Sequence, residues 1–185
     1  MSFPGIKIED DSKNILKTNV YIGIGSNLGN REENLDGALE SVKRIEGAEL
    51  TSFSSIYESE PMYLSAQPDY LNLAAKISTS LSPLILLEAL LLIESEMGRK
   101  RELKYGPRVI DLDILFFGEQ IVDSESLTIP HPLLYDRLFV LKPLSEIAGE
   151  LICPVRQKTV SELLKLSNDN SRISKYENKT PAEVG

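Results

Sequence analysis

The spacing of apolar positions predicts three strands in the first half of the chain. Residues 19–25, 50–57 and 70–79 are short runs rich in apolar and β-branched side chains, and turn-forming or polar residues bound them. Residues 58–69 separate the second run from the third and contain two prolines. This stretch is predicted to be a loop, because proline fixes its own φ angle and lacks a backbone donor.

Two other stretches repeat apolar residues at helical spacing. The first starts with Asn30 as its N-cap and has Glu33 three residues later, in the manner of a capping box. Its apolar residues share one face: Leu35, Ala38, Leu39, Val42 and Ile45. The second helix is predicted to begin at Ser82 and Pro83 and to stop at Gly98.

A fourth strand follows the second helix, and its two faces differ in polarity. Every second residue from Val109 to Phe117 shares one face, which includes Asp111 and Asp113. The opposite face is apolar throughout: Ile110, Leu112, Ile114 and Phe116. We therefore expect a strand that is buried on one side and presents two carboxylates on the other.

The predicted order is strand, helix, strand, strand, helix, strand, then an extra hairpin that begins at Gly118 and runs through Ile121, and C-terminal helices. This order is typical of an α+β sandwich of the ferredoxin-like βαββαβ type, with two helices on one face of a sheet. The open face can then carry a site. Residues 18–166 form the predicted domain, and the polar residues 1–17 and 167–185 are predicted to be flexible.

Length and composition narrow the class of protein. A chain of 185 residues with 42% hydrophobic residues can bury one core. Its formal net charge of −8 argues against general binding to nucleic acid or to membrane surfaces. The single cysteine, Cys153, excludes a disulfide framework and a multi-cysteine zinc site, and the most apolar run, residues 84–93, is too short to span a bilayer. We expect a monomeric cytoplasmic protein.

A cationic loop precedes the paired aspartates. Its local charge balance is +5 − 1 = +4, with Glu102 as the one acid among five bases: Arg99, Lys100, Arg101, Lys104 and Arg108. This concentration indicates an anion site, and a divalent cation shared with phosphate oxygens would relieve the repulsion between the aspartates. The alternative is a salt-bridge cluster in which the loop alone neutralises them.

The glycine-rich segment 23–29 leaves two interpretations open. It resembles a dinucleotide-binding fingerprint, but its last glycine falls one position late. Ser26 and Asn27 could contact a ligand at this strand end, or they could hydrogen-bond a neighbouring loop.

Two further polar residues are candidates for the same site. Glu94 lies beside the apolar stripe of the second helix, where it could contact a ligand or pair with Arg99 or Arg101. His131 is the only histidine and lies between two prolines, so its direction is restricted. It is either a structural residue or a donor to phosphate.

Several motifs together resemble one enzyme family. They are residues 21–28 (YIGIGSNL), 67–72 (QPDYLN), 98–99 (GR), 106–114 (GPRVIDLDI), 128–132 (TIPHP) and 137–141 (RLFVL). In order and spacing they are similar to the 6-hydroxymethyl-7,8-dihydropterin pyrophosphokinases of folate biosynthesis, over about residues 18–154. The resemblance implies a ferredoxin-like α+β fold and the transfer of pyrophosphate from ATP to a reduced pterin, with release of AMP.

The resemblance also implies roles for individual residues. Asp111 and Asp113 would hold two Mg²⁺ ions that bridge the ATP phosphates, and Arg99 and Arg108 would stabilise charge on the transferred group. The residues implied to contact ATP are Glu94, Arg101, Ile114, Thr128, His131 and Arg137. Those implied to bind the pterin are Ser59, Met62, Tyr70, Asn72, Tyr105 and Phe139, with Tyr70 and Phe139 on either side of its ring.

Three positions depart from the family pattern. Tyr105 stands where well-known members carry Trp, Leu91 stands at a position that is polar in some members, and Pro132 follows His131 where an aromatic residue can occur. Two other classes of protein remain as alternatives. One is a non-catalytic ferredoxin-like RNA or ligand module, and the other is a nucleotidyl- or glycosyltransferase with an Asp-x-Asp metal site.

Overall fold

The computed structural model describes residues 17–62, 66–99 and 106–177. In chain order the elements are β1 (Thr18–Ser26), α1 (Arg31–Val42), β2 (Ala48–Phe53), β3 (Tyr57–Ser59), β4 (Tyr70–Thr79), α2 (Pro83–Glu96), β5 (Asp111–Phe117), β6 (Val122–Asp123), β7 (Thr128–Ile129), a short 3-10 helix (Leu134–Asp136), α3 (Leu138–Ala148), α4 (Val160–Leu166) and β8 (Ile173–Lys175). Within these ranges no helix has the length and apolar character needed to cross a bilayer.

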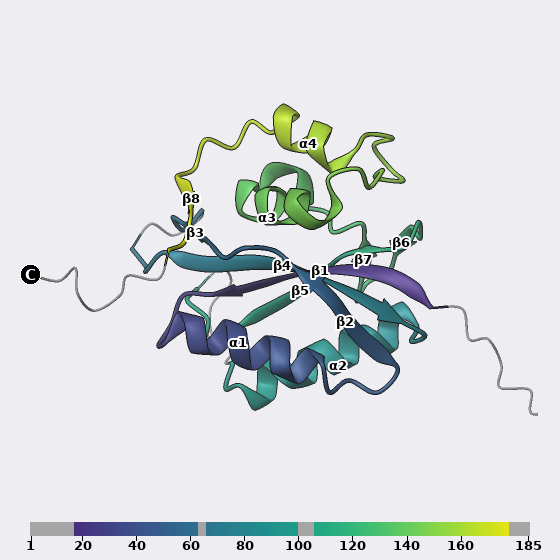
Figure 1. Ribbon diagram of the computed structural model, residues 1–185, viewed down its shortest axis with the longest axis horizontal. Helices are drawn as coiled ribbons and strands as arrows, with labels where there is room; N and C mark the ends of the chain where they lie inside the picture. Colours follow the sequence, from purple (N-terminus) through teal and green to yellow (C-terminus); the bar gives the residue numbers. More distant parts are fainter. Residues whose placement is uncertain (1–16, 63–65, 100–105, 178–185) are drawn as a thin grey trace, which may run out of the picture.

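The elements form three layers around an antiparallel sheet. The strand order is β5-β1-β4-β3-β8, and β2 pairs with the other half of β4. Helices α1 and α2 cover one face, and α3 and α4 lie over the other (Figure 1). The α+β sandwich is therefore confirmed, but the second face is not left open, because α3 packs against it through Val140, Leu141 and Leu144.

Local signals set both helices on the first face as predicted. The side chain of Asn30 accepts a hydrogen bond from Glu33 N at the start of α1, and Ser82 accepts one from Ile85 N at the start of α2. The buried residues of α1 are four of those predicted from the helical spacing: Leu35, Ala38, Leu39 and Val42. The fifth, Ile45, lies beyond the end of the helix and packs against the core partly buried. The chain leaves α2 through Gly98, whose φ of +86° is a conformation that favours glycine.

The predicted strand 50–57 is instead two strands, β2 and β3, that pair with different halves of β4. The break lies at Ser54, which is buried. Its N–H donates to Ala74 O at 2.9 Å, and its Oγ accepts from Ala74 N at 3.0 Å. A side-chain oxygen therefore replaces a backbone carbonyl in the ladder and interrupts the strand.

Strand β5 keeps the predicted alternation only up to Leu115. Leu112 and Ile114 lie in the core beneath α1 and α2, whereas Leu115 packs beneath α3. A register shift against β1 then places Phe116 beneath α3 and Phe117 in the α1–α2 core, the reverse of the prediction. An extra residue in one strand of a pair reverses every later side chain, which explains the error.

The predicted extra hairpin after Gly118 is present as a separate two-stranded sheet in which β6 pairs with β7. The predicted flexible tail beginning at residue 167 is wrong for residues 167–177, because β8 pairs with β3 at the sheet edge. Residues 1–16 and 178–185 lie outside the described part of the chain.

Candidate active site

A pocket opens between the sheet and the beginning of α3. Its cavity volume is about 230 Å³, which is room for several water molecules or part of a small ligand. It brings together these predicted site residues: Ser59, Met62, Tyr70, Asn72, Arg108, Asp111, Asp113, His131, Arg137 and Phe139. Lining residues that sequence reasoning did not assign include Glu60, Gln67, Ala74, Leu115 and Val140.

One end of the pocket presents a pair of buried polar side chains. Asn72 Nδ2 donates to Ser59 Oγ at 2.9 Å, and the two residues are 6% and 1% exposed. Their strands, β4 and β3, are paired here, so the sheet itself sets their positions. Tyr70 begins β4 on the same side, and burial raises the pKa of its hydroxyl, which keeps the ring neutral.

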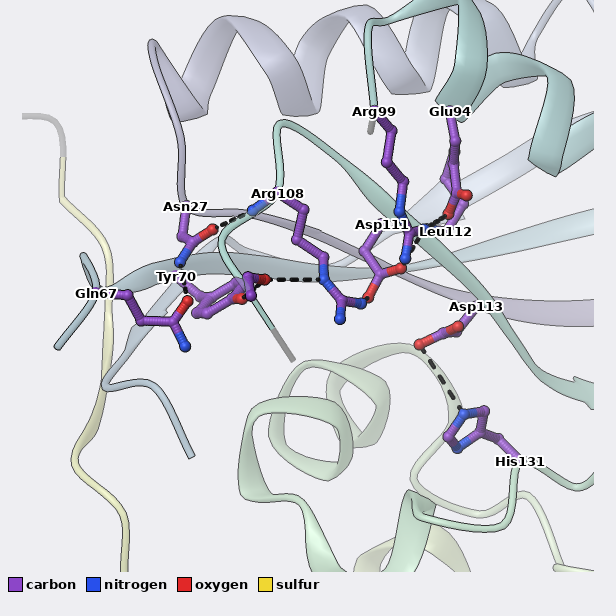
Figure 2. A network of polar contacts seen from close by, with 11 residues as sticks. Asn27, Gln67, Tyr70, Glu94, Arg99, Arg108, Asp111, Leu112, Asp113 and His131 are labelled. Carbon is purple, nitrogen blue, oxygen red and sulfur yellow. Dashed lines mark hydrogen bonds and ion pairs between the residues drawn. The ribbon is translucent and has the colours of Figure 1, made fainter. Parts of the chain in front are cut away.

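The other end is built around Asp111, the first residue of β5. Arg99 Nη1 lies 2.5 Å from Asp111 Oδ1, and Arg108 Nη1 lies 2.5 Å from Oδ2. Figure 2 shows both guanidinium groups directed at this carboxylate. The salt-bridge alternative left open by the sequence therefore describes Asp111 in this structure. Burial opposes the charge on Arg108, but Asp111 outweighs it and raises the Arg108 pKa.

Glu94 lies behind this cluster and does not line the pocket. The residue is 2% exposed, and its Oε1 accepts from Leu112 N at 2.8 Å and pairs with Arg99. Of the two interpretations of Glu94, pairing with Arg99 is the one that the structure contains. Glu94 thereby fixes the end of α2 to β5 and orients Arg99 toward Asp111.

Asp113 and His131 face each other on the remaining wall, with Oδ2 and Nε2 4.0 Å apart. Desolvation in the pocket and the charge of Asp111 raise the pKa of Asp113 to about 7. Burial, with the nearby Arg137, lowers the pKa of His131 to about 4, so the imidazole is neutral. Its Nδ1 accepts from Leu133 N at 3.2 Å, which leaves the proton on Nε2, the atom that faces the pocket.

Arg137 and Phe139 form the wall contributed by α3. The guanidinium of Arg137 lies over the Phe139 ring, 5.5 Å from its centroid. Two other predicted ATP contacts do not line the pocket: Thr128 is in β7, and Ile114 is 3% exposed in the core beneath α1 and α2. Arg101 and Tyr105 lie outside the described residues.

Asn27 links the two ends of the pocket. Its Oδ1 accepts from Arg108 N at 2.7 Å, and its Nδ2 donates to Gln67 Oε1 at 3.1 Å (Figure 2). The same Nδ2 also donates to Pro68 O at 3.2 Å. The sequence left open whether Asn27 contacts a ligand or hydrogen-bonds a neighbouring loop, and the structure shows the hydrogen bonds to loops. The side chain connects the strand end to both site loops.

The carboxylates of the pocket fit a Mg²⁺ ion that arrives bound to a nucleotide better than a metal ion held by the protein alone. Among the described residues there is no group of three or more His, Cys, Asp or Glu side chains that could hold a metal ion. Mg²⁺ usually takes one or two carboxylates and completes its octahedron with waters and substrate phosphates. Asp111 and Asp113 supply this number on one face of β5.

Comparison with known proteins agrees with this geometry. The family model described as 7,8-dihydro-6-hydroxymethylpterin-pyrophosphokinase (HPPK) matches residues 21–149, which span all the pocket-lining residues. The chain belongs to the HPPK family. It is therefore an enzyme of the pyrophosphokinase class.

Individual relatives support the family assignment. The 2-amino-4-hydroxy-6-hydroxymethyldihydropteridine pyrophosphokinase of Haemophilus influenzae is 45% identical over 153 residues, which cover 83% of this chain and 95% of the relative. The folic acid synthesis protein fol1 of Pneumocystis carinii is 51% identical over 136 residues, which cover 74% of this chain but 18% of the relative. This member of the HPPK family is thus similar to a short portion of some longer proteins.

A solved structure supports the fold alone. The HPPK-DHPS of Plasmodium falciparum, crystallised with pterin and p-hydroxybenzoate, matches with a TM-score of 0.66 at 17% identity. The match covers 80% of this chain and 43% of that one. The ferredoxin-like arrangement predicted from the order of elements is confirmed by this match.

Proposed function

We propose that this chain transfers pyrophosphate from ATP to 6-hydroxymethyl-7,8-dihydropterin and releases AMP, a reaction of folate biosynthesis. The observation that carries the proposal is that one pocket joins two carboxylates on β5 to the buried Asn72–Ser59 pair. The first feature suits a metal-bound polyphosphate, and the second suits the polar edge of a flat heterocycle. Family membership names the two substrates.

The phosphate end would be organised by Asp111 and Asp113, which would hold two Mg²⁺ ions together with phosphate oxygens. Bound in this way, the ions neutralise charge on the oxygens of the transferred group. Arg99 and Arg108 would then turn from Asp111 to the phosphates, because a phosphate offers each guanidinium a multiply charged partner. His131 would donate from Nε2, and Arg137 would add positive charge at the same wall.

The heterocycle end would place the pterin ring between Tyr70 and Phe139. Asn72 and the chain at Ser59 would hydrogen-bond its polar edge, and Met62 would supply an apolar wall. Offset stacking on two aromatic rings holds a flat ligand in one plane without demanding a charged partner. Tyr105 is proposed for this group from the resemblance alone.

ATP would be held further by residues around the cluster. Glu94 would act by holding Arg99, since its carboxylate is buried away from the pocket. Contacts to ATP from Arg101, Ile114 and Thr128 are proposed from the family resemblance alone. The side chain of Ile114 lies in the core, so its contact would come from the backbone.

The reaction would proceed by direct displacement. The pterin hydroxymethyl oxygen forms a bond to the β-phosphorus while the bond from that phosphorus to the oxygen bridging to the α-phosphate breaks, and AMP leaves. Arginines placed on the transferred group stabilise its charge in the transition state more than in the bound substrate. No covalent enzyme intermediate is required.

Product identification tests this proposal. Incubation of the protein with Mg²⁺, ATP and the pterin, followed by mass spectrometry, should give AMP and pterin diphosphate in equal amounts. Release of ADP would show that one phosphoryl group is transferred, and release of inorganic pyrophosphate would favour a nucleotidyltransferase. Binding of single-stranded RNA at physiological salt, without catalysis, would favour the non-catalytic alternative.

A further inference from the structure

The segment that follows α4 crosses from one wall of the pocket to the other. Residues 167–176, named here the strap, leave α4 beside α3 and end in β8 at the sheet edge next to β3, seen in yellow in Figure 1. The strap lies beyond residues 21–149, the part matched by the family model. None of its residues lines the pocket.

One end of the strap is bonded to the wall that carries Ser59. Strand β8 pairs with β3, with Ile173 opposite Ser59. Arg172 N donates to Glu60 Oε1 at 2.8 Å, and Glu60 N donates to Arg172 O at 3.2 Å. The Arg172 guanidinium also lies 2.8 Å from Asp69 Oδ2, next to Tyr70. The strap is thus bonded to Glu60 and Asp69, which lie in the connection between β3 and β4 on the heterocycle side of the pocket.

The other end of the strap is bonded to the first turn of α3. Asp169 Oδ2 accepts from Leu138 N at 2.8 Å, and Asp169 Oδ1 accepts from Ser171 N at 2.8 Å. The residue at the N-cap position of α3, Arg137, provides no side-chain cap. Asp169 therefore caps this helix from a distant part of the chain, and its negative charge favours the positive end of the helix dipole.

The residues that the strap holds apart are the two sides of the proposed pterin site. Leu138 lies directly between Arg137 and Phe139, and Glu60 directly follows Ser59. Most of the phosphate end has a different support, since β5 carries the aspartates and Asn27 bonds the backbone of Arg108. Arg137 is the exception, because it adjoins Leu138. A change in the strap should therefore alter the heterocycle end more than the phosphate end.

We propose that the strap sets the separation between Phe139 and the Ser59 wall, and that Asp169 is a positioning residue for the heterocyclic substrate. This inference rests on the proposed function, because it takes Phe139 and Ser59 as contacts of the pterin. Asp169 acts through the start of α3 and touches no substrate. Its effect should appear chiefly in pterin affinity, with a smaller effect on ATP affinity through Arg137 and none on the bond-making step.

Asp169→Ala tests the proposal, with Thr159→Ala as the matched control. Thr159 caps α4 through the same kind of bond, from Glu162 N to its side chain, so each substitution removes one helix cap. For Asp169→Ala we expect the KM for the pterin to rise about fivefold, with kcat unchanged and a smaller rise in the KM for ATP, since loss of a cap shifts a local equilibrium by about that factor. Thr159→Ala should lower the melting temperature similarly and leave all three constants unchanged.

A conservative variant separates position from general stability. Asp169→Asn keeps an oxygen that can accept from Leu138 N, so it should restore most of the pterin affinity. If Asp169→Ala does not fold, Asp169→Asn still carries the test, through a smaller rise in the pterin KM.

The outcomes distinguish this inference from the proposed function. A wild-type protein that forms no AMP with pterin would refute the proposed function itself. An active wild type with an unchanged pterin KM in Asp169→Ala, or an equal rise in both KM values, would refute the strap's positioning role alone.

Discussion

Gly25 of β1 and Asn72 of β4 are direct partners in the sheet, and a Cβ added at Gly25 would lie 2.9 Å from Asn72 Oδ1. The absence of a side chain at Gly25 is what allows Asn72 to lie in the pocket wall. We predict that Gly25→Ala displaces the Asn72 amide and raises the KM for the pterin by roughly tenfold, the effect of losing about one good hydrogen bond.

Gly37→Ala is the control for that substitution. Gly37 lies inside α1, where an added Cβ meets only Met97 Cε at 3.4 Å. Alanine there should raise the free energy of unfolding by up to about 1 kcal/mol and leave the kinetic constants unchanged. If Gly25→Ala also left the pterin KM unchanged, Asn72 would not be the group that reads the pterin edge.

Asp113 is predicted to be essential for turnover and dispensable for folding. Its carboxylate is close to the like charge of Asp111, so Asp113→Asn removes a repulsion as well as a metal ligand. We expect the rate of AMP formation at saturating Mg²⁺ to fall at least about 100-fold, as for loss of one major electrostatic group, with a melting temperature equal to or above that of wild type. Turnover near the wild-type rate would rule out metal binding at Asp113.

The contribution of Arg108 to catalysis should depend on the planar shape of its guanidinium group as well as on its charge. Arg108→Ala is expected to lower kcat about 100-fold, and Arg108→Lys should recover only part of that loss, because an ammonium cannot bond two phosphate oxygens in one plane. The backbone bond from Arg108 N to Asn27 is retained in both variants, so the loop position should persist. Full recovery by lysine, measured by single-turnover kinetics, would show that a point charge suffices.

The bond between Tyr57 and Glu146 predicts a pH dependence of stability. Glu146 of α3 accepts from Tyr57 Oη at 2.6 Å and from Ser55 N at 2.7 Å. Burial acts to raise the Glu146 pKa, but these bonds prevail and lower it below its ordinary value of 4.5. The stabilisation is therefore present above that value and is lost as pH falls through the lower pKa of the folded state.

A double-mutant cycle measures this contribution. Tyr57→Phe and Glu146→Gln should show a coupling free energy of roughly 0.5–1 kcal/mol at neutral pH, reduced because Glu146 is largely exposed. Urea unfolding well below the ordinary carboxylate pKa should show a smaller coupling. A coupling that stays constant across this range would mean that the charge of Glu146 contributes nothing.

The parts of the fold that the sequence predicted are those set by near neighbours. The caps at Asn30 and Ser82 each join residues three apart, so the local order of residues contains the whole signal. The buried face of α1 follows from a period of 3.6 for the same reason.

The parts that sequence reasoning missed depend on partners far along the chain. The break at Ser54 arises from Ala74, the reversal at Phe116 arises from a shift against Tyr21, and β8 exists because β3 offers it an unpaired edge. Residues 167–177 are polar, and polar composition alone is typical of a flexible tail. Backbone pairing with a sheet edge leaves no mark in that composition.

The candidate site divides in the same way. The strand period of two is enough to place Asp111 and Asp113 on one face of β5. The role of Asn27 stayed open, because its side-chain partners Gln67 and Arg108 are 40 and 81 residues away. The role of Glu94 also stayed open. Its place beside the apolar stripe is compatible both with pairing to Arg99, which the structure shows, and with contact to a ligand.

A crystal structure with Mg²⁺, a non-hydrolysable ATP analogue and the pterin is the most direct test of the central claim. We predict that Asp111 and Asp113 coordinate the metal ions and that Arg99 and Arg108 leave Asp111 for phosphate oxygens. A nucleotide bound elsewhere, with both arginines still paired to Asp111 as they are in the present structure, would contradict the account.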